Sequence, residues 1–215
     1  MSTPSVVTRA AVIVAHPDDE TLWAGGTILN RPGWSWWILA LCRASDPDRA
    51  PKFRRVVQAL GAEGAIADLD DGPEQSPLSA ESVRDMIRTV VAGRSFDVVV
   101  THGPRGEYTR HRRHEETCRA VAELWAVGGI EAKALWMFAF EDGGRAHLPR
   151  AIESASLVEP LSDTIWRRKQ ELITDVYGCD VASWEARVTP RTEAFYRFDR
   201  PDAATAWVEA NGVEP

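Results

Sequence analysis

Residues 11–20 decide the fold and read Ala11-Val12-Ile13-Val14-Ala15-His16-Pro17-Asp18-Asp19-Glu20. The first half of this stretch is apolar, and the second half places three ionisable groups within the four positions from His16 to Asp19. The pattern predicts a buried strand that delivers a reactive cluster to its carboxyl end. Open α/β sheets bind their ligands at that edge, in the crevice outside the strand ends.

His16 and Asp19 have the spacing of two ligands for one cation. They lie three positions apart in the sequence, which places both side chains on the same side of a first helical turn. Asp18 lies between them and is expected to point elsewhere. A carboxylate beside a metal, but not bound to it, is suited to act as the general base for a metal-bound water.

The rest of the chain alternates apolar runs with amphipathic segments, which is typical of βαβ units with a mostly parallel sheet. We expect strands at residues 12–15, 36–41, 65–69, 97–101 and 133–140, and a short strand near 195–198. We expect helices at residues 21–30, 52–60, 79–92, 115–127, 160–177 and 203–210. The predicted fold is α/β and Rossmann-like, with helices flanking the sheet in a single domain over residues 1–215, whose pattern weakens after residue 178.

Composition excludes several classes of protein. With 215 residues, of which 44% are hydrophobic and 27% charged, the chain can bury a sizeable core. A net charge of -7 argues against a nucleic-acid-binding surface. Residues 1–5 are too short and polar for a signal peptide, and no apolar run approaches membrane-spanning length. Cys42, Cys118 and Cys179 form no CxxC pair and are typical of reduced, mostly buried thiols in a cytoplasmic protein.

A second polar loop follows the strand expected at residues 97–101, and it reads Thr101-His102-Gly103-Pro104-Arg105-Gly106-Glu107-Tyr108-Thr109-Arg110-His111-Arg112-Arg113-His114-Glu115-Glu116. Four of the five histidines lie in the two loops, and only His147 lies outside them. A parallel sheet would bring both loops to the same edge. His16, Asp19 and His114 would then supply two imidazoles and one carboxylate, the donor set of a hydrolytic zinc site with open positions.

These residue types suit the hydrolysis of an amide. The open metal positions would take a water and the substrate carbonyl oxygen, so that the metal acidifies the nucleophile and polarises the electrophile. Asp18 would remove the water proton, while His111 would stabilise the oxyanion or protonate the leaving amine. Two imidazoles and a carboxylate suit Zn²⁺ and also Fe²⁺.

The two motifs resemble those of the PIG-L/LmbE-like N-acetylglucosaminyl deacetylases. The first is His16-Pro17-Asp18-Asp19-Glu20 with Gly25-Gly26-Thr27, and the second comprises residues 101–104, residues 106–108 and the His111 and His114 pair. The resemblance implies a Rossmann-like fold, a divalent metal that is usually zinc, and removal of an acyl group from an amino sugar or a glycoconjugate. It also implies the metal ligands His16, Asp19 and His114, the general base Asp18, and the assisting acid or electrostatic stabiliser His111.

The second motif departs from the family pattern in two ways. Arg112-Arg113 replaces the usual Pro-Asp between the two histidines, which would place two cations beside the metal. Tyr108 lies three residues before His111, whereas the family pattern places a tyrosine two residues before it. By the resemblance, Tyr108 is the candidate for the substrate-binding role of that tyrosine, in a loop that is one residue longer. Arg49 is a further candidate for contact with a substrate hydroxyl or carboxylate, and a solvated helix face is its alternative role.

Other interpretations of these features stay open. The first motif also suits a turn that caps the following helix. The second motif also suits a solvated basic loop. His102 either lines the pocket or fixes its loop by a hydrogen bond. Gly25-Gly26 lacks GxGxxG spacing, so close helix packing explains it better than nucleotide binding. We assign no substrate role to Trp34, Trp36 or Trp37.

Two other classes of function remain as alternatives to a deacetylase. One is a nucleotide-cofactor enzyme on the same fold, for which the glycine-rich loop is missing, and the other is a non-catalytic sugar-binding protein. Asp18 distinguishes these classes, because a binding module has no use for an unliganded carboxylate beside the metal. The expected partner is a small-molecule N-acyl amino sugar or glycoconjugate, with no nucleic acid and no membrane.

Overall fold

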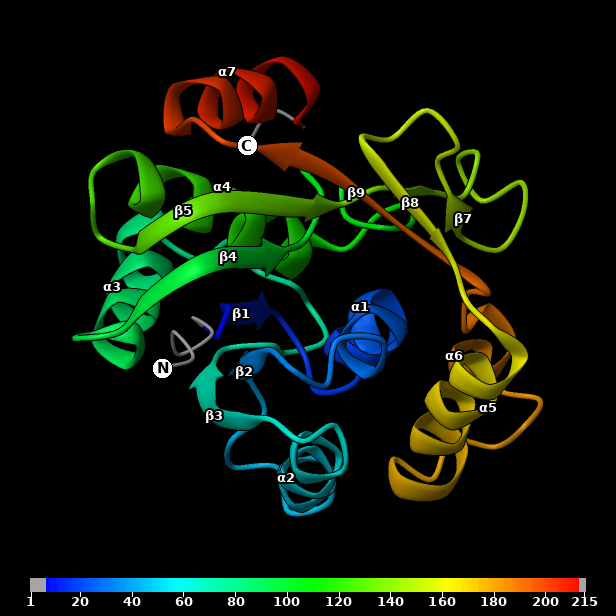
Figure 1. Ribbon diagram of the computed structural model, residues 1–215. Coiled ribbons are helices and arrows are strands. Elements are labelled where there is room, and N and C mark those ends of the chain that lie inside the picture. Colours follow the sequence, from blue (N-terminus) through cyan, green and yellow to red (C-terminus); the bar gives the residue numbers. More distant parts are fainter. Residues whose placement is uncertain (1–6, 213–215) are drawn as a thin grey trace, which may run out of the picture.

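The computed structural model describes residues 7–212, in which one seven-stranded sheet carries helices on both faces (Figure 1). The strand order is β3-β2-β1-β4-β5-β9-β8. The strands are β1 (Arg9–Val14), β2 (Ser35–Cys42), β3 (Glu63–Leu69), β4 (Ser95–Thr101), β5 (Glu131–Phe138), β8 (Leu157–Pro160) and β9 (Thr192–Phe198). The first five strands in this order are parallel, and β9 pairs antiparallel with both of its neighbours, β5 and β8. The order 3-2-1-4-5 is that of the doubly wound Rossmann sheet and confirms the predicted fold class.

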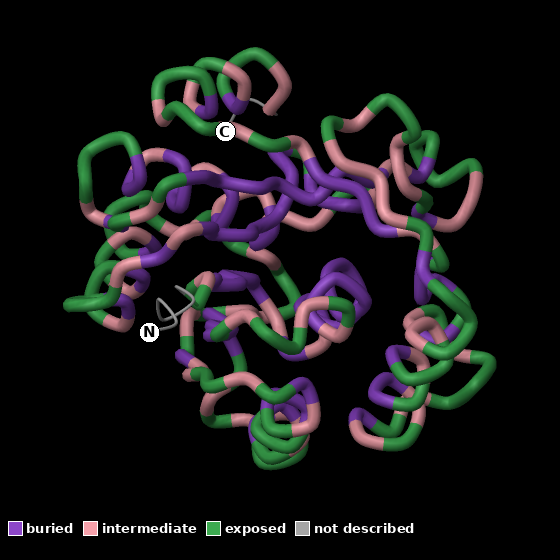
Figure 2. The backbone as a smooth tube through the Cα atoms, viewed as in Figure 1, coloured by how far each residue is buried: buried purple, intermediate pink, exposed green. Residues whose placement is uncertain are grey.

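The central strands are buried on both faces, as parallel strands between two helical layers must be. In β1, Ala10, Val12 and Val14 pack into one core, while Ala11 and Ile13 pack into the other. Figure 2 shows the consequence as a continuous buried band through the middle of the molecule. This double burial explains why β1 appears in the sequence as an unbroken apolar run rather than an alternating one.

Each face of the sheet has its own group of helices. The helices are α1 (Asp19–Leu29), α2 (Arg49–Ala59), α3 (Ala80–Val91), α4 (Arg112–Ala126), α5 (Asp163–Glu171), the π-helix η1 (Leu172–Val176), α6 (Trp184–Val188) and α7 (Pro201–Asn211). Side chains of α1, α2 and η1 pack into one core, and those of α3, α4 and α7 pack into the other. Among residues 7–212, no helix combines the length and the apolar character needed to cross a bilayer.

The carboxyl-terminal third departs from the predicted elements. The helix expected over residues 160–177 is wrong at its start, because Pro160 ends strand β8 and the helix α5 begins only at Asp163. Ser162 fixes this start, since its side chain accepts a hydrogen bond from the Ile165 N–H. The strand expected at residues 133–140 is also divided, into β5 and the two-residue β6 (Phe140–Glu141), which pairs with β7 (Arg150–Ala151).

Several smaller predictions can be compared with the fold. A Cβ on Gly26 would overlap the Leu161 side chain, which confirms that close helix packing explains this glycine. Trp36 and Trp37 are core residues. The cysteines are free, with Cys42 and Cys118 buried and Cys179 partly so. The prediction about a signal peptide concerns residues 1–5, which lie outside the described part of the chain.

Candidate active site

The two polar loops meet at the carboxyl ends of β1 and β4, which are neighbours in the sheet. His16 lies in the turn after β1, and Asp19 is the first residue of α1. His114 lies in the first turn of α4, after the loop that follows β4. The strand order changes direction between β1 and β4, and at such a switch point the loops diverge and leave a crevice for ligands.

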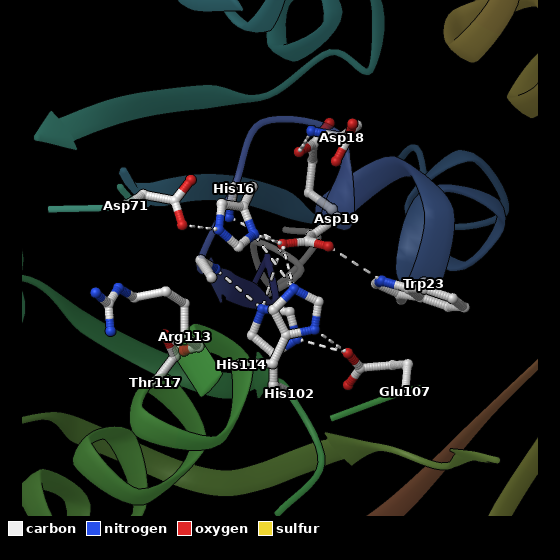
Figure 3. A network of polar contacts seen from close by, with 12 residues as sticks. His16, Asp18, Asp19, Trp23, Asp71, His102, Glu107, Arg113, His114 and Thr117 are labelled. Carbon is white, nitrogen blue, oxygen red and sulfur yellow. Dashed lines mark hydrogen bonds and ion pairs between the residues drawn. The ribbon is translucent and has the colours of Figure 1, made fainter. Parts of the chain in front are cut away.

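The side chains of His16, Asp19 and His114 converge on one point (Figure 3). His16 Nδ1 lies 3.1 Å from Asp19 Oδ2 and 3.3 Å from His114 Nε2. His114 Nε2 lies 3.3 Å from Asp19 Oδ2, which closes the triangle. Ligand atoms of a tetrahedral zinc ion lie about 3.3 to 3.4 Å apart when each bond measures about 2.0 to 2.1 Å. The spacing and chemistry of these three atoms therefore fit a divalent metal.

Each of the three converging side chains is held by a further polar contact on its outer side. Glu107 Oε2 lies 2.6 Å from His114 Nδ1, and Asp71 Oδ1 lies 3.2 Å from His16 Nε2. The Trp23 indole N–H donates to Asp19 Oδ1 at 3.2 Å. Carboxylates behind ligating histidines set the ring orientation and increase the basicity of the ligand. Here they leave His16 Nδ1 and His114 Nε2 facing the centre of the triangle.

The charges around this triangle favour a cation. Burial lowers the pKa of His114, but the carboxylates of Asp19 and Glu107 outweigh it and raise that pKa to about 10. Burial opposes ionisation of Asp19, yet His114 and His102 hold the pKa of its carboxyl well below its usual range. A buried point that attracts a proton this strongly also attracts a divalent metal in its place.

His102 is also close to the triangle, but its ring nitrogens are engaged elsewhere. Its Nε2 accepts a hydrogen bond from the Ala15 N–H at 2.9 Å, so the proton resides on Nδ1, which donates to Glu107 Oε2 at 2.9 Å. The Nε2 lone pair is thereby used, although this atom lies only 3.5 Å from Asp19 Oδ2. Of the two roles left open for His102, the structure shows the one that fixes the loop.

Three other groups of donor atoms lie close enough together to bind a metal, and all are less suitable. One combines Asp19 and His114 with His102, whose Nε2 is already used. Cys42 lies near His16 and Asp71, but burial raises the pKa of its thiol to about 12, which disfavours the thiolate form. Asp71 is already paired with Arg43 and Gln75. In the last group, His111 takes the place of Asp19 beside His16 and His114, so the three donors are imidazoles without a carboxylate to balance the charge of the metal.

Asp18 points away from the triangle, as expected for a carboxylate that is not a ligand (Figure 3). Its left-handed backbone, with φ of 107°, turns the side chain outward at the start of α1. Asp18 Oδ2 accepts a hydrogen bond from Arg49 Nη1 at 2.9 Å, and the Asp18 N–H donates to Glu20 Oε2 at 3.0 Å. Burial and the neighbouring Asp19 raise the pKa of the Asp18 carboxyl to about 8, against the opposing charge of Arg49.

His111 precedes α4 as its N-cap residue and covers the triangle from the side of the second loop. Its ring stacks on His114 with 4.4 Å between centroids. Its Nδ1 is buried and has no hydrogen-bond partner among the described residues. Burial and the adjacent His114 lower the pKa of His111 to about 3. A neutral imidazole with one unpaired ring nitrogen therefore lies against the triangle.

A cavity of about 640 Å³ opens beside the triangle, and Asp18, Arg49, Gln75, Tyr108, His111 and Trp184 are among its lining residues. Tyr108 forms part of the wall, with its ring edge toward His111 at 5.8 Å between centroids. Arg49 lines the cavity while paired with Asp18. The structure thus brings together all seven residues singled out from the sequence, and their roles stay predictions.

The prediction that Arg112 and Arg113 place two cations beside the metal is wrong. The Arg113 guanidinium turns away from the triangle and donates to the Asp70 and Ser76 carbonyl oxygens at 2.6 and 2.8 Å, while also pairing with Glu116. Arg112 lines a separate hollow beside Leu78. Arg113 therefore supports the loop that carries Asp71, because a buried guanidinium needs several acceptors and the carbonyls of that loop supply them.

Sequence reasoning missed four residues of the site. Glu107 and Asp71 act through the histidines that they contact, and Gln75 and Trp184 line the cavity. The sequence does mark Asp71, because the acidic pair Asp70-Asp71 follows β3 just as Asp18-Asp19 follows β1. No sequence pattern marks Trp184, because α6 is too short to show helical periodicity.

The residues of the triangle lie in the part of the chain that matches a known protein family. A family model described as PIG-L, GlcNAc-PI de-N-acetylase, matches residues 11–125, the segment that supplies the triangle, Asp18 and His111. The chain belongs to the PIG-L family. A curated relative, uncharacterized protein L374 of Acanthamoeba polyphaga mimivirus, is 20% identical over 129 residues, which cover 53% of this chain and 56% of that protein. The chain thus matches only about half the length of this relative.

Solved structures share the fold of this PIG-L family member. The N,N'-diacetylchitobiose deacetylase of Pyrococcus horikoshii superposes with a TM-score of 0.68 and 14% identity, covering 90% of this chain and 85% of that one. GalB, the 4-carboxy-2-hydroxymuconate hydratase of Pseudomonas putida KT2440, superposes with a TM-score of 0.63 and 14% identity, covering 90% and 98%. At such identities the likeness concerns the fold.

Proposed function

We propose that this PIG-L family member is a metal-dependent hydrolase that removes an N-acyl group, such as acetyl, from an amino sugar or a glycoconjugate. The observation that carries the proposal is the triangle of His16 Nδ1, Asp19 Oδ2 and His114 Nε2, with sides of 3.1 to 3.3 Å, beside a cavity that Asp18 lines. The description of the family and the activity named for the Pyrococcus horikoshii structure support the choice of substrate.

His16, Asp19 and His114 would hold the metal, and their donor set suits Zn²⁺ with Fe²⁺ as the alternative. When bound, a divalent metal lowers the pKa of a water molecule and polarises an acyl carbonyl. Glu107 and Asp71 would keep the two imidazoles oriented, because each contacts the ring nitrogen on the outer side of its histidine.

The remaining residues would move the protons. Asp18 would accept a proton from the attacking water, since its carboxylate lines the cavity and is not needed as a ligand. His111 would donate either to the developing oxyanion or to the departing amine, because its buried Nδ1 has no partner among the described residues. Tyr108 would contact the substrate from the cavity wall, and Arg49 on the same wall would orient Asp18 through their ion pair. A cytoplasmic location is part of the proposal and is supported by the free cysteines.

The first experiment combines metal analysis with an activity screen. Wild type, His114→Ala and His147→Ala are reconstituted with Zn²⁺ or Fe²⁺, analysed for metal, and assayed for amine release from N-acetyl amino sugars and their glycosides. His147 is the matched control, because it contacts Glu141 and the Leu148 carbonyl rather than the triangle. We expect near-stoichiometric metal in wild type and His147→Ala, loss of metal in His114→Ala, and amine release only where metal is retained.

Three outcomes would contradict the proposal in different ways. A protein without metal after reconstitution would overturn the ligand assignment. Metal bound without amine release from any N-acyl sugar would overturn the deacetylase assignment. Addition of water to an unsaturated carboxylic acid, tested in parallel because GalB shares the fold, would assign the site to a hydratase instead.

A further inference from the structure

Gln75 presents an acceptor that no residue in the described part of the chain satisfies. Its Nε2 donates to Asp71 Oδ1 at 2.7 Å and to the Gly72 carbonyl oxygen at 3.2 Å, whereas its Oε1 is buried without a partner. Rotating the amide by half a turn would place Oε1 against those two acceptors, so the hydrogen-bond network fixes its orientation. Gln75 lines the cavity, and an acceptor buried there without a partner is costly unless a bound molecule supplies a donor.

Trp184 presents an aromatic ring at the same cavity. It is the first residue of α6 and is 36% exposed, one of the few large hydrophobic side chains that the described chain leaves at its surface. Its ring is held edge to face against Tyr108, with 4.7 Å between centroids and 64° between planes. A fixed, partly exposed aromatic ring offers an apolar surface to a ligand at little cost in conformational entropy.

Gln75 and Trp184 come from distant segments, the loop after β3 and the start of α6, yet they line one cavity with the triangle. The volume of about 640 Å³ lies within the range of pockets that enclose a drug-sized ligand. An acyl group at the triangle would occupy only part of this space. The remainder offers an aromatic ring and a hydrogen-bond acceptor to the rest of the substrate.

We propose that Trp184 and Gln75 select the substrate by recognising a saturated polyhydroxylated ring. Trp184 stacks on the apolar face of the ring, and Gln75 Oε1 accepts a hydrogen bond from a hydroxyl on its edge. The inference rests on the proposed function, and it assigns recognition of the sugar ring to these two residues. Neither residue belongs to the triangle, and Gln75 reaches it only through Asp71, whose Oδ1 also contacts His16.

The test measures equilibrium binding to metal-free protein, so that it does not depend on turnover. The probes are methyl N-acetyl-β-glucosaminide and its analogues that each lack one ring hydroxyl, and titration calorimetry gives the affinity. The variants are Trp184→Ala and Gln75→Leu, with Gln75→Met as a second variant closer in shape. Val181→Ala is the matched control, because Val181 is 76% exposed, lies on the same segment and is not among the cavity lining residues.

We expect Trp184→Ala to weaken binding of the glycoside about tenfold, as the loss of one aromatic contact implies, and Val181→Ala to leave it unchanged. Removing one particular hydroxyl should weaken binding to wild type but not to Gln75→Leu or Gln75→Met. Equal affinities of Trp184→Ala and wild type, equal hydroxyl dependence in the Gln75 variants and wild type, or no binding of any glycoside would overturn the inference. Absence of amine release with intact binding would instead count against the proposed function alone.

Discussion

Arg49 Nη1 lies 2.9 Å from Asp18 Oδ2, so the first residue of α2 holds the residue that precedes α1. Arg49→Ala should therefore lower kcat about 10- to 100-fold with little change in KM, because the base loses the contact that orients it. Arg49→Lys should recover part of the loss by keeping the charge. Steady-state kinetics on one sugar substrate checks this. A raised KM with unchanged kcat would favour direct contact between Arg49 and the substrate.

Asp18→Asn separates catalysis from metal binding. The amide keeps the shape of the side chain but cannot accept a proton, so kcat should fall by about 10² to 10⁴ while metal content stays near that of wild type. Activity assays and elemental analysis on the same preparation measure both quantities. Asp48→Asn is the control, because Asp48 is exposed and pairs with Lys52. Unchanged turnover in Asp18→Asn would exclude Asp18 as the base, and loss of metal would show that it is a ligand.

Glu107 accepts hydrogen bonds from both His102 Nδ1 and His114 Nδ1 through its Oε2, at 2.9 and 2.6 Å. Glu107→Gln keeps the volume but removes the charge behind His114, and metal affinity should fall about 10- to 100-fold. Competition with a chromophoric chelator measures the affinity. Glu115→Gln is the matched control, because Glu115 pairs with Arg110 outside the cluster. Equal affinities of the two variants would show that Glu107 only supports the loop.

The triangle could be predicted from the sequence because the ligands lie in two short motifs that follow predictable strands. His16 and Asp19 are fixed by local spacing, and His114 follows from the parallel sheet that brings its loop to the same edge. Asp71 and Glu107 could not be assigned in this way, since their role depends on which ring nitrogen each one meets in three dimensions. Local spacing carries no such information.

The carboxyl-terminal third shows a second limit of sequence reasoning. The apolar spacing over residues 160–177 is helical, but pairing of β8 with β9 extends the strand to Pro160, and the helix then starts at the Ser162 cap. Trp184 similarly gains its place from its contact with Tyr108, a residue that lies far from it in the sequence, in the loop after β4. Tertiary pairing of this kind overrides local pattern.

Gly26→Ala tests the packing of α1 against the carboxyl-terminal segment. A Cβ at this position would overlap the Leu161 side chain and approach Glu193 Oε1 at 3.0 Å. The free energy of unfolding should fall by about 1 to 3 kcal/mol, the usual cost of overpacking. Gly33→Ala is the control, because a Cβ there meets no atom within 4 Å. Denaturant titration compares the two, and equal stability would mean that Leu161 moves aside freely.

Lys169 and Glu193 form an ion pair with 2.7 Å between Nζ and Oε1, and both side chains are fully buried. The Glu193 carboxylate also accepts the backbone N–H groups of Gly26 and Thr27, at 2.8 and 2.6 Å. Lys169→Met should lower the free energy of unfolding by about 3 to 5 kcal/mol, because it leaves a carboxylate buried without a cation.

Lys133→Met is the control for this pair, since Lys133 contacts Asp97 at 2.7 Å but is 78% exposed, and it should cost at most about 1 kcal/mol. Urea titration of both variants measures the difference. Similar losses would mean that the N–H groups of α1 alone stabilise the Glu193 charge. The expected larger loss would show that Lys169 neutralises the carboxylate that ties β9 to the helix carrying Asp19.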